Sequence, residues 1–416
     1  MISEAFAYRD RTLYCEDVAL ADIARRVSTP CFVYSASGIR RRFEAYDRAF
    51  GETPHQVCYA VKANSNLSVL RLLGEAGAGF DIVSAGELFR VIKAGGDPAR
   101  TVFSGVGKRA EEIEYALERG VHSFNCESAD EMRLIDSVAA RLARKARVAY
   151  RVNPDIDPKT HKYISTGLRE NKFGVAIADA PALYRQALGY ENLTVSGVSC
   201  HIGSNLLDVA PMLEAVERVL ALVDELRAAG APITELDLGG GLGVAYRDDE
   251  REPSIAEAIG AMCQRAAGRG LTLQVEPGRS IVGPEGVLLT RVLYRKKSAD
   301  KEFMVIDASM TELIRPALYE AWHDIIPLRT APERGTVTAD VVGPVCESGD
   351  FLAKDREMPN AAPGDLLAVC TAGAYGFVQA SNYNSRPRPA EVLVESAAWR
   401  IVRQRESFED LIRGEE

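Results

Sequence analysis

From about residue 56, short apolar segments alternate with amphipathic ones, and this alternation constrains the fold more than any other feature of the chain. The apolar segments are rich in β-branched and aromatic residues and end in polar residues or glycine. They lie at 56–61, 79–84, 101–105, 123–126, 147–153, 195–200, 235–240 and 271–278. Eight strands with helices between them predict a closed parallel (β/α)8 barrel, and an open doubly wound sheet is the alternative.

The segments between the strands have helical periodicity. In the first of them, Leu67, Leu70, Leu73 and Ala76 recur at the spacing of one helix face. A longer one, at 211–230, keeps the same periodicity over five turns and ends at Gly230, which is a typical residue just past a helix C-terminus.

After about residue 283 the alternation stops, and strand-like runs follow one another with little helix between them. They predict a second, mostly antiparallel β-sandwich or β-barrel domain. The segments 6–17 and 29–35 are also strand-like, and we expect them to join that domain because the barrel count is already complete. The predicted domains are therefore a barrel at 36–282 and a β-rich domain at 1–35 and 283–416.

Bulk properties exclude several classes of protein. The net charge of -9 argues against a nucleic-acid partner or an anionic membrane surface. The N-terminus is charged, and no apolar stretch approaches the roughly 20 residues that span a bilayer, so we expect a cytoplasmic protein. The eight cysteines and five histidines are scattered. This indicates buried free thiols in a reducing compartment, and we expect no metal site.

In a barrel of this kind the reactive groups follow the carboxyl ends of the strands. Strand one ends at Lys62, whose amine we expect at the barrel mouth. Enclosure there would disfavour the ammonium form, as a Schiff-base lysine requires. The alternative is a surface lysine whose stem covers apolar groups.

The end of strand seven adds a second signal, the glycine-rich run at 239–243. Loops after strands seven and eight of such barrels commonly bind phosphate, and glycines let backbone N–H groups approach it closely. A phosphate site with a lysine at the same mouth suggests pyridoxal phosphate. Glu276, after strand eight, would keep the pyridine nitrogen protonated, and His201 could stack on the ring or be a hydrogen-bonded interior histidine.

The ordered set of motifs resembles the alanine-racemase-like, barrel-type pyridoxal-phosphate decarboxylases, and most closely the diaminopimelate decarboxylase family. The motifs are TPCFVYS (29–35), YAVKAN (59–64), FDIVSAGEL (80–88), HKYISTGLRENKFG (161–174), HIGSN (201–205), DLGGGLG (237–243), EPGRS (276–280), ELIRPALYEAWHDI (312–325), CESGD (346–350), GAYG (373–376) and NYNSRPRPAEVLV (382–394). The resemblance covers nearly the whole chain.

The resemblance implies decarboxylation of meso-2,6-diaminopimelate to L-lysine and CO2, the last step of lysine biosynthesis. It implies a homodimer in which Cys346 and Glu347 reach the neighbouring subunit's active site. The implied catalytic residues are Lys62 and Cys346, the latter as general acid. The implied cofactor contacts are Lys62, Asp81, His201, Ser204, Gly240, Gly241, Gly243, Glu276, Gly278, Arg279 and Tyr375. The implied substrate contacts are Arg279, Arg315, Tyr319, Glu347 and Tyr375.

The chemistry of the substrate agrees with these roles. Diaminopimelate carries a carboxylate at its unreacted end, which the planar fork of Arg315 could bind, and Glu347 could accept the distal ammonium. A thiol has an ordinary pKa of about 8.5, so it is mostly protonated at neutral pH and can act as an acid.

Three alternatives stay open at this point. One is a decarboxylase for another amino acid such as ornithine, which has no distal carboxylate. Another is a racemase, although racemases of this fold place arginine, not a carboxylate such as Glu276, against the pyridine nitrogen. The last is a catalytically silent relative, which would be expected to have lost Lys62 or Cys346.

Overall fold

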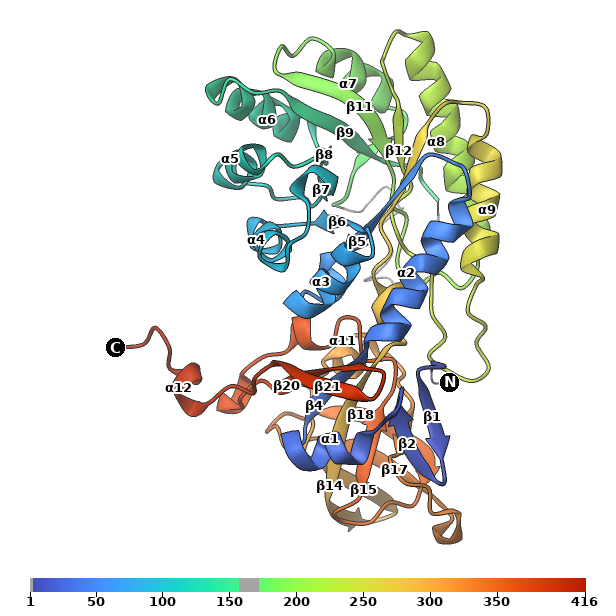
Figure 1. The fold of residues 1–416 in the computed structure, drawn as a ribbon, viewed down its shortest axis with the longest axis vertical. Helices are drawn as coiled ribbons and strands as arrows, with labels where there is room; N and C mark the ends of the chain where they lie inside the picture. The colour runs from blue at the N-terminus through green and yellow to red at the C-terminus, as the bar shows by residue number, and fades with distance from the viewer. Residues whose placement is uncertain (1–2, 157–171) are drawn as a thin grey trace. The chain divides into compact units, whose positions relative to one another are not determined.

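The computed structural model describes residues 3–156 and 172–416, and the chain divides into two compact units (Figure 1). The barrel unit comprises Arg42–Val244 and Glu252–Ser280. The β-rich unit comprises Met1–Arg41, Ala245–Arg251 and Ile281–Glu416. The short segment 245–251 thus belongs to the β-rich unit, although it lies inside the range 36–282 that the sequence assigns to the barrel.

The barrel unit contains a closed ring of eight parallel strands. Each strand pairs with the next along the chain, and the last pairs with the first, so no edge is left open. In ring order they are β5 (His55–Ala60), β6 (Gly79–Ile82), β7 (Thr101–Phe103), β8 (Ser123–Cys126), β9 (Ala146–Asn153), β11 (Leu193–Ser199), β12 (Glu235–Asp237) and β13 (Thr272–Val275). The predicted (β/α)8 barrel is confirmed, and the open sheet is excluded.

Helices cover the outside of the ring, as Figure 1 shows for α4, α5 and α6. The bounds are α2 (Ala36–Phe50), α3 (Leu67–Glu75), α4 (Ala85–Ala94), α5 (Ala110–Arg119), α6 (Ala129–Arg141), α7 (Ala180–Ala187), α8 (Ala210–Ala228) and α9 (Ile255–Ala266), with the short elements η1 (Val61–Ala63), η2 (Pro98–Arg100) and β10 (Val175–Ala176). Serine side chains cap several of these helices; Ser84, for example, accepts from the N–H of Glu87 at the start of α4.

Two helix predictions have different outcomes. Gly230 follows α8 with a φ of +91°, as expected of a residue just past a helix C-terminus. The buried face of α3 was only partly predicted. Leu70 and Leu73 are buried, but Leu67 is 38% exposed, and Val69 and Leu72 complete the buried face instead. Leu67 is the first residue of the helix, so it lies next to the preceding loop and not within the packed helix face.

The β-rich unit contains a three-stranded antiparallel sheet and a larger, mostly antiparallel sheet. The small sheet is β1 (Phe6–Arg9), β2 (Thr12–Cys15) and β3 (Val18–Ala19). The larger one runs β18 (Phe351–Pro359), β17 (Thr336–Val342), β15 (Lys301–Ile306), β14 (Gly286–Ser298), β4 (Cys31–Ser35), β20 (Ala390–Glu395) and β21 (Ala398–Arg403). Off this path, β19 (Leu366–Val369) pairs with β14, and β16 (Ile325–Pro327) pairs with β19. The short helices are α1 (Leu20–Val27), α10 (Arg279–Val282), α11 (Arg315–Tyr319), α12 (Phe408–Leu411), η3 (Pro332–Arg334), η4 (Phe377–Gln379) and η5 (Tyr383–Ser385).

The N-terminal strand β4 lies between β14 and β20, so the start of the chain is built into the C-terminal sheet, as the sequence predicts. All five residues of β4 are buried. Two of them, Cys31 and Val33, share one core with Val287 and Leu289 of β14 and Val392 of β20. Within the described residues, no helix combines the length and hydropathy needed to cross a membrane.

Candidate functional site

Polar side chains collect where the barrel strands end. Lys62 follows β5 in η1, and its Nζ lies 2.8 Å from Oδ2 of Asp81, the next-to-last residue of β6. Asp81 is fully buried, and among the described residues its Oδ1 has no hydrogen-bond partner. The predicted enclosure of Lys62 is partial, since its side chain keeps 39% exposure and faces a carboxylate, which stabilises the ammonium form.

A buried carboxyl pair lies beside this ion pair. Glu276, after β13, lies close to Asp237, which ends β12, and the two carboxyl groups interact. Burial and the neighbouring carboxylates of Asp237 and Asp81 raise the pKa of Glu276 well above its ordinary value. Asp237 accepts further hydrogen bonds from the Asn125 amide at 2.7 Å and the Gly239 N–H at 2.9 Å. Burial raises the pKa of Asp237 as well, but these donors act against that rise, so they favour the proton of the pair on Glu276.

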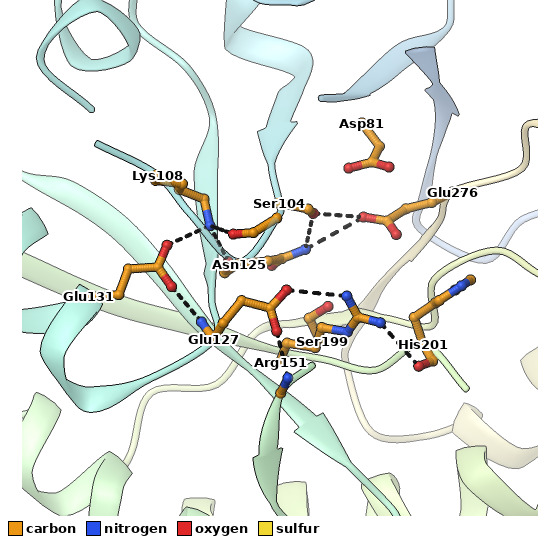
Figure 2. Close-up of polar contacts among 12 residues, drawn as sticks. Asp81, Ser104, Lys108, Asn125, Glu127, Glu131, Arg151, Ser199, His201 and Glu276 are labelled. Carbon is orange, nitrogen blue, oxygen red and sulfur yellow. Dashed lines mark hydrogen bonds and ion pairs between the residues drawn. The ribbon is translucent and has the colours of Figure 1, made fainter. Parts of the chain in front are cut away.

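Asn125, on β8, links this pair to the rest of the barrel interior, and Figure 2 shows its contacts with Ser104 and Glu276. Its amide nitrogen contacts Asp237, Ser104 Oγ at 3.2 Å and Glu276 Oε1 at 3.5 Å. Its backbone carbonyl accepts a hydrogen bond from Lys108 at 2.7 Å. Lys108 has no exposed side-chain surface, and its ammonium also binds the Gly105 carbonyl at 2.9 Å and Glu131 Oε1 at 2.7 Å. Three acceptors therefore satisfy its three donors.

His201 follows β11 and is held by the glycine run. Its Nδ1 accepts a hydrogen bond from the Gly240 N–H at 3.1 Å. Burial, together with the charges of Arg151 and Lys62, lowers the pKa of His201 well below its ordinary value. The ring is therefore neutral and carries its proton on Nε2. A second ion pair, between Arg151 and Glu127 at 3.2 Å, lies next to it, and Arg151 also reaches the His201 carbonyl (Figure 2).

The glycine run at 239–243 packs too closely for side chains. A Cβ on Gly240 would collide with the backbone oxygen of Glu276, and one on Gly241 would collide with the carbonyl of Gly203. Gly241 also has a φ of +110°, which favours glycine. The N–H groups of Gly239, Gly240 and Gly243 already have partners, so the loop uses three of its five N–H groups for its own shape.

We expect Gly240→Ala to weaken cofactor binding at least about tenfold, because the added methyl must push the loop away from Glu276 at a cost of roughly 1–3 kcal/mol. The measurement is equilibrium binding of pyridoxal phosphate to cofactor-free protein. Gly260→Ala, in α9, is the matched control, because a Cβ there meets open space. Equal affinity in the two variants would contradict the tight packing of the loop.

The remaining predicted cofactor contacts of the barrel lie at the same end. Arg279 is 7% exposed and donates to Ser204 Oγ at 3.2 Å. A Cβ on Gly278 would press against Ala60 and Ala63, on either side of Lys62 in the chain. The Glu276 N–H bonds to the Gly239 carbonyl at 2.8 Å, which ties the two loops together. Lys62 and the glycine run therefore lie at one end of the barrel.

The β-rich unit holds the other predicted site residues. Arg315 begins α11 and is buried, Tyr319 ends that helix half-buried, and Tyr375 is half-buried with a φ of +54°. Cys346 and Glu347 are both exposed, and the Cys346 N–H donates to Asn384 Oδ1 at 2.8 Å. Of the motif at 161–174, residues 161–171 lie outside the described residues.

Several residues of the site were missed by the sequence reasoning. Ser104, Lys108, Asn125 and Asp237 form the polar network behind Glu276, and no role was assigned to any of them. A signal was present for two, since Asn125 and Asp237 are polar residues at or next to the carboxyl ends of predicted barrel strands. Buried polar groups in a strand must find partners, which marks them as members of a network.

Comparison with known proteins agrees with this arrangement. The family model described as "Pyridoxal-dependent decarboxylase, pyridoxal binding domain" matches residues 36–283. A diaminopimelate decarboxylase of Pseudomonas aeruginosa is 55% identical over 415 residues, which cover 99% of each chain.

Solved structures are similar over almost the entire chain. A Helicobacter pylori diaminopimelate decarboxylase, complexed with L-lysine, has a TM-score of 0.91 at 43% identity and covers 95% of this chain and 98% of its own. One from M. jannaschii, in co-complex with L-lysine, has a TM-score of 0.95 at 36% identity and covers 100% of this chain and 99% of its own.

Proposed function

Because the chain belongs to the pyridoxal-dependent decarboxylases, we propose that it converts meso-2,6-diaminopimelate to L-lysine and CO2, the last step of lysine biosynthesis. The observation that carries the proposal is the end of the barrel, where Lys62, Asp81, Glu276 and the glycine run meet. Support for the substrate comes from relatives named diaminopimelate decarboxylase that match nearly the full chain, two of them solved with L-lysine.

The residues at this end of the barrel fit pyridoxal phosphate. Lys62 supplies a primary amine for covalent attachment of an aldehyde and contacts Oδ2 of Asp81, whose Oδ1 has no hydrogen-bond partner among the described residues. The glycine run packs against the backbone of the neighbouring loops too closely for any Cβ, and glycines of this kind let backbone N–H groups approach a phosphate. Arg279 and Ser204 supply a guanidinium and a hydroxyl of the kind that phosphate binds. The carboxyl of Glu276 is buried, and its raised pKa makes it a proton source for a pyridine nitrogen, which it can then face as a carboxylate.

Pyridoxal phosphate, when bound, supplies a conjugated ring that accepts the electron pair left when the Cα–carboxylate bond breaks. Lys62 would hold it covalently through Nζ. Glu276 carries a proton on its carboxyl and can share it with the ring nitrogen, while Asp237 and Asn125 keep that carboxyl in place. The neutral His201, fixed by the Gly240 N–H, offers an uncharged ring face against which the cofactor can stack.

We assign the substrate contacts to the β-rich unit and to Arg279. Arg315 would bind the distal carboxylate, Glu347 would accept the distal ammonium, and Tyr319 would line the substrate; Tyr375 would contact both the cofactor phosphate and the substrate. Cys346 would give its Sγ proton to Cα after CO2 has left. General acid catalysis of this kind typically raises the rate about 10²–10⁴-fold. The exposure of Cys346 and Glu347 supports a role in which they act outside their own chain.

We therefore propose a homodimer with shared active sites, and mixed dimers test it. Lys62→Ala and Cys346→Ala should each be nearly inactive alone. Mixing them should restore about a quarter of wild-type activity, because half of the dimers are hybrids and each hybrid has one intact site. The measurement is CO2 release after the two variants are dissociated and reassociated together. No recovery in verified hybrids would overturn the sharing of Cys346 between subunits.

A cytoplasmic location is part of the proposal. Six of the eight cysteines are buried free thiols, and Cys346 is an exposed one that the chemistry requires to stay reduced. Free thiols in this number are typical of a reducing compartment.

The proposed function is tested by supplying meso-diaminopimelate, ornithine, arginine and L-lysine separately to the cofactor-loaded protein. We expect equal amounts of CO2 and L-lysine from meso-diaminopimelate and little CO2 from the others. Turnover of ornithine or arginine in preference would instead establish a decarboxylase of another basic amino acid. Inversion at Cα without CO2 release would establish a racemase.

A further inference from the structure

Arg315 is held in the β-rich unit by a buried histidine to which no role has been assigned. The Arg315 guanidinium NH1 lies 2.8 Å from Nε2 of His323, which follows α11 and is fully buried. Arg315 itself is only 7% exposed. The contact is therefore shielded from water, where a hydrogen bond to a charged donor is strong and directional.

The hydrogen bonds of His323 fix which of its two nitrogens carries the proton. Nδ1 lies 2.8 Å from the backbone carbonyl of Cys370, and a carbonyl can only accept. The guanidinium can only donate. One neutral tautomer satisfies both partners, with the proton on Nδ1 and the lone pair on Nε2. The Cys370 N–H also donates to the carbonyl of Asp324, the residue after His323, at 2.8 Å. The backbone next to His323 is therefore hydrogen-bonded to the same residue that its Nδ1 contacts.

Tyr246 supports the same guanidinium from a second direction. The Arg315 Cζ lies 4.7 Å from the centre of the Tyr246 ring, and that ring meets the His323 ring edge-on at 5.2 Å. Arg356, on β18, donates to the His323 carbonyl at 2.9 Å. The Arg315 charge is thus held by a neutral acceptor and an aromatic face.

We propose that His323 is a positioning residue that orients the Arg315 guanidinium for the carboxylate at the unreacted end of the substrate. The inference rests on the proposed function, which assigns that carboxylate to Arg315. A neutral acceptor suits this task, because it fixes the guanidinium without neutralising it. An aspartate or glutamate in its place would compete with the substrate for the same charge.

Two isosteric variants separate positioning from folding. Asparagine can place its amide nitrogen where Nδ1 lies, so His323→Asn keeps the bond to Cys370 and loses the acceptor for Arg315. Glutamine can place its oxygen near Nε2, so His323→Gln keeps the acceptor and loses the bond to Cys370. We expect His323→Asn to raise KM for meso-diaminopimelate about tenfold with kcat changed less than about threefold. His323→Gln should restore most of the lost affinity.

Ligand binding gives a readout independent of turnover. L-lysine keeps the carboxylate at the unreacted end, whereas cadaverine has no carboxylate. In the holoenzyme we expect His323→Asn to weaken L-lysine binding by the same factor as KM and to leave cadaverine binding unchanged. Equal KM values in the two variants, or equal losses for L-lysine and cadaverine, would overturn the positioning role. If wild-type protein releases no CO2 from meso-diaminopimelate, the proposed function fails instead, and the two failures are distinguishable.

Discussion

Replacing Lys62 by arginine is expected to slow CO2 release from meso-diaminopimelate by roughly 10⁴-fold or more, because the residue that holds the cofactor is lost. Arginine is the more informative substitution than alanine. It keeps a cation beside the buried Asp81, whose Oδ2 the wild-type ammonium contacts at 2.8 Å, but it offers no primary amine. Lys62→Ala would also leave that carboxylate buried without a counter-charge, so its loss of activity could reflect a disturbed fold.

The measurement is single-turnover CO2 release at saturating cofactor, with thermal unfolding of each variant alongside. Lys93→Arg, at an exposed lysine on α4, is the control and should behave as wild type. A Lys62→Arg protein that unfolds at the wild-type temperature and still turns over within tenfold of wild type would remove Lys62 from the mechanism.

Lys108→Met is expected to give the largest loss of stability, about 3–5 kcal/mol, since it breaks a buried ion pair from one side. Lys108 has no exposed side-chain surface, and its partner Glu131 is 8% exposed, so the substitution leaves a carboxylate in the interior (Figure 2). The carbonyls of Gly105 and Asn125 lose their donor as well. The Asn125 amide donates to Asp237, so a shift of Asn125 should also disturb the hydrogen bonds of the Glu276–Asp237 carboxyl pair.

Urea unfolding followed by circular dichroism measures the effect. The double variant Lys108→Met/Glu131→Gln removes the stranded charge, and we expect it to be more stable than Lys108→Met alone. Lys297→Met, at an exposed lysine on β14, should change the unfolding midpoint little. A Lys108→Met midpoint equal to that of the control would mean that the ion pair contributes nothing to the fold.

The barrel could be predicted from the sequence because its strands are buried on both faces. Such strands are continuous apolar runs, and their number and order fix which end carries the chemistry. Counting strands therefore placed Lys62, His201, Glu276 and the glycine run at one end, where the structure also has them.

The strand-like runs expected after residue 283 do not include β16, β18 or β21 of the larger sheet. β18 and β21 are the two ends of the path through that sheet, and each pairs with one neighbour on it. Edge strands are half exposed and tolerate charge, so the apolar signal is weak: β18 contains Lys354, Asp355 and Arg356, and β21 contains Arg400 and Arg403. The apolar pattern of a sequence therefore does not identify strands that are only partly buried.

The polar network behind Glu276 and the histidine behind Arg315 could not be predicted for a different reason. Their meaning depends on contacts between residues far apart in the chain, such as Asn125 with Asp237 and His323 with Cys370. A sequence shows that a polar residue lies in an apolar strand, but the partner that satisfies it appears only when the strands are placed side by side.

The role of Lys62 as the residue that holds the cofactor can be tested by finding which lysine carries it. The cofactor-loaded protein is reduced with borohydride, digested, and examined by mass spectrometry for the peptide that bears the pyridoxyl group. We expect the label on Lys62 in near-stoichiometric amount. Label on another lysine, such as the buried Lys108, or protein that retains no label at all, would contradict it.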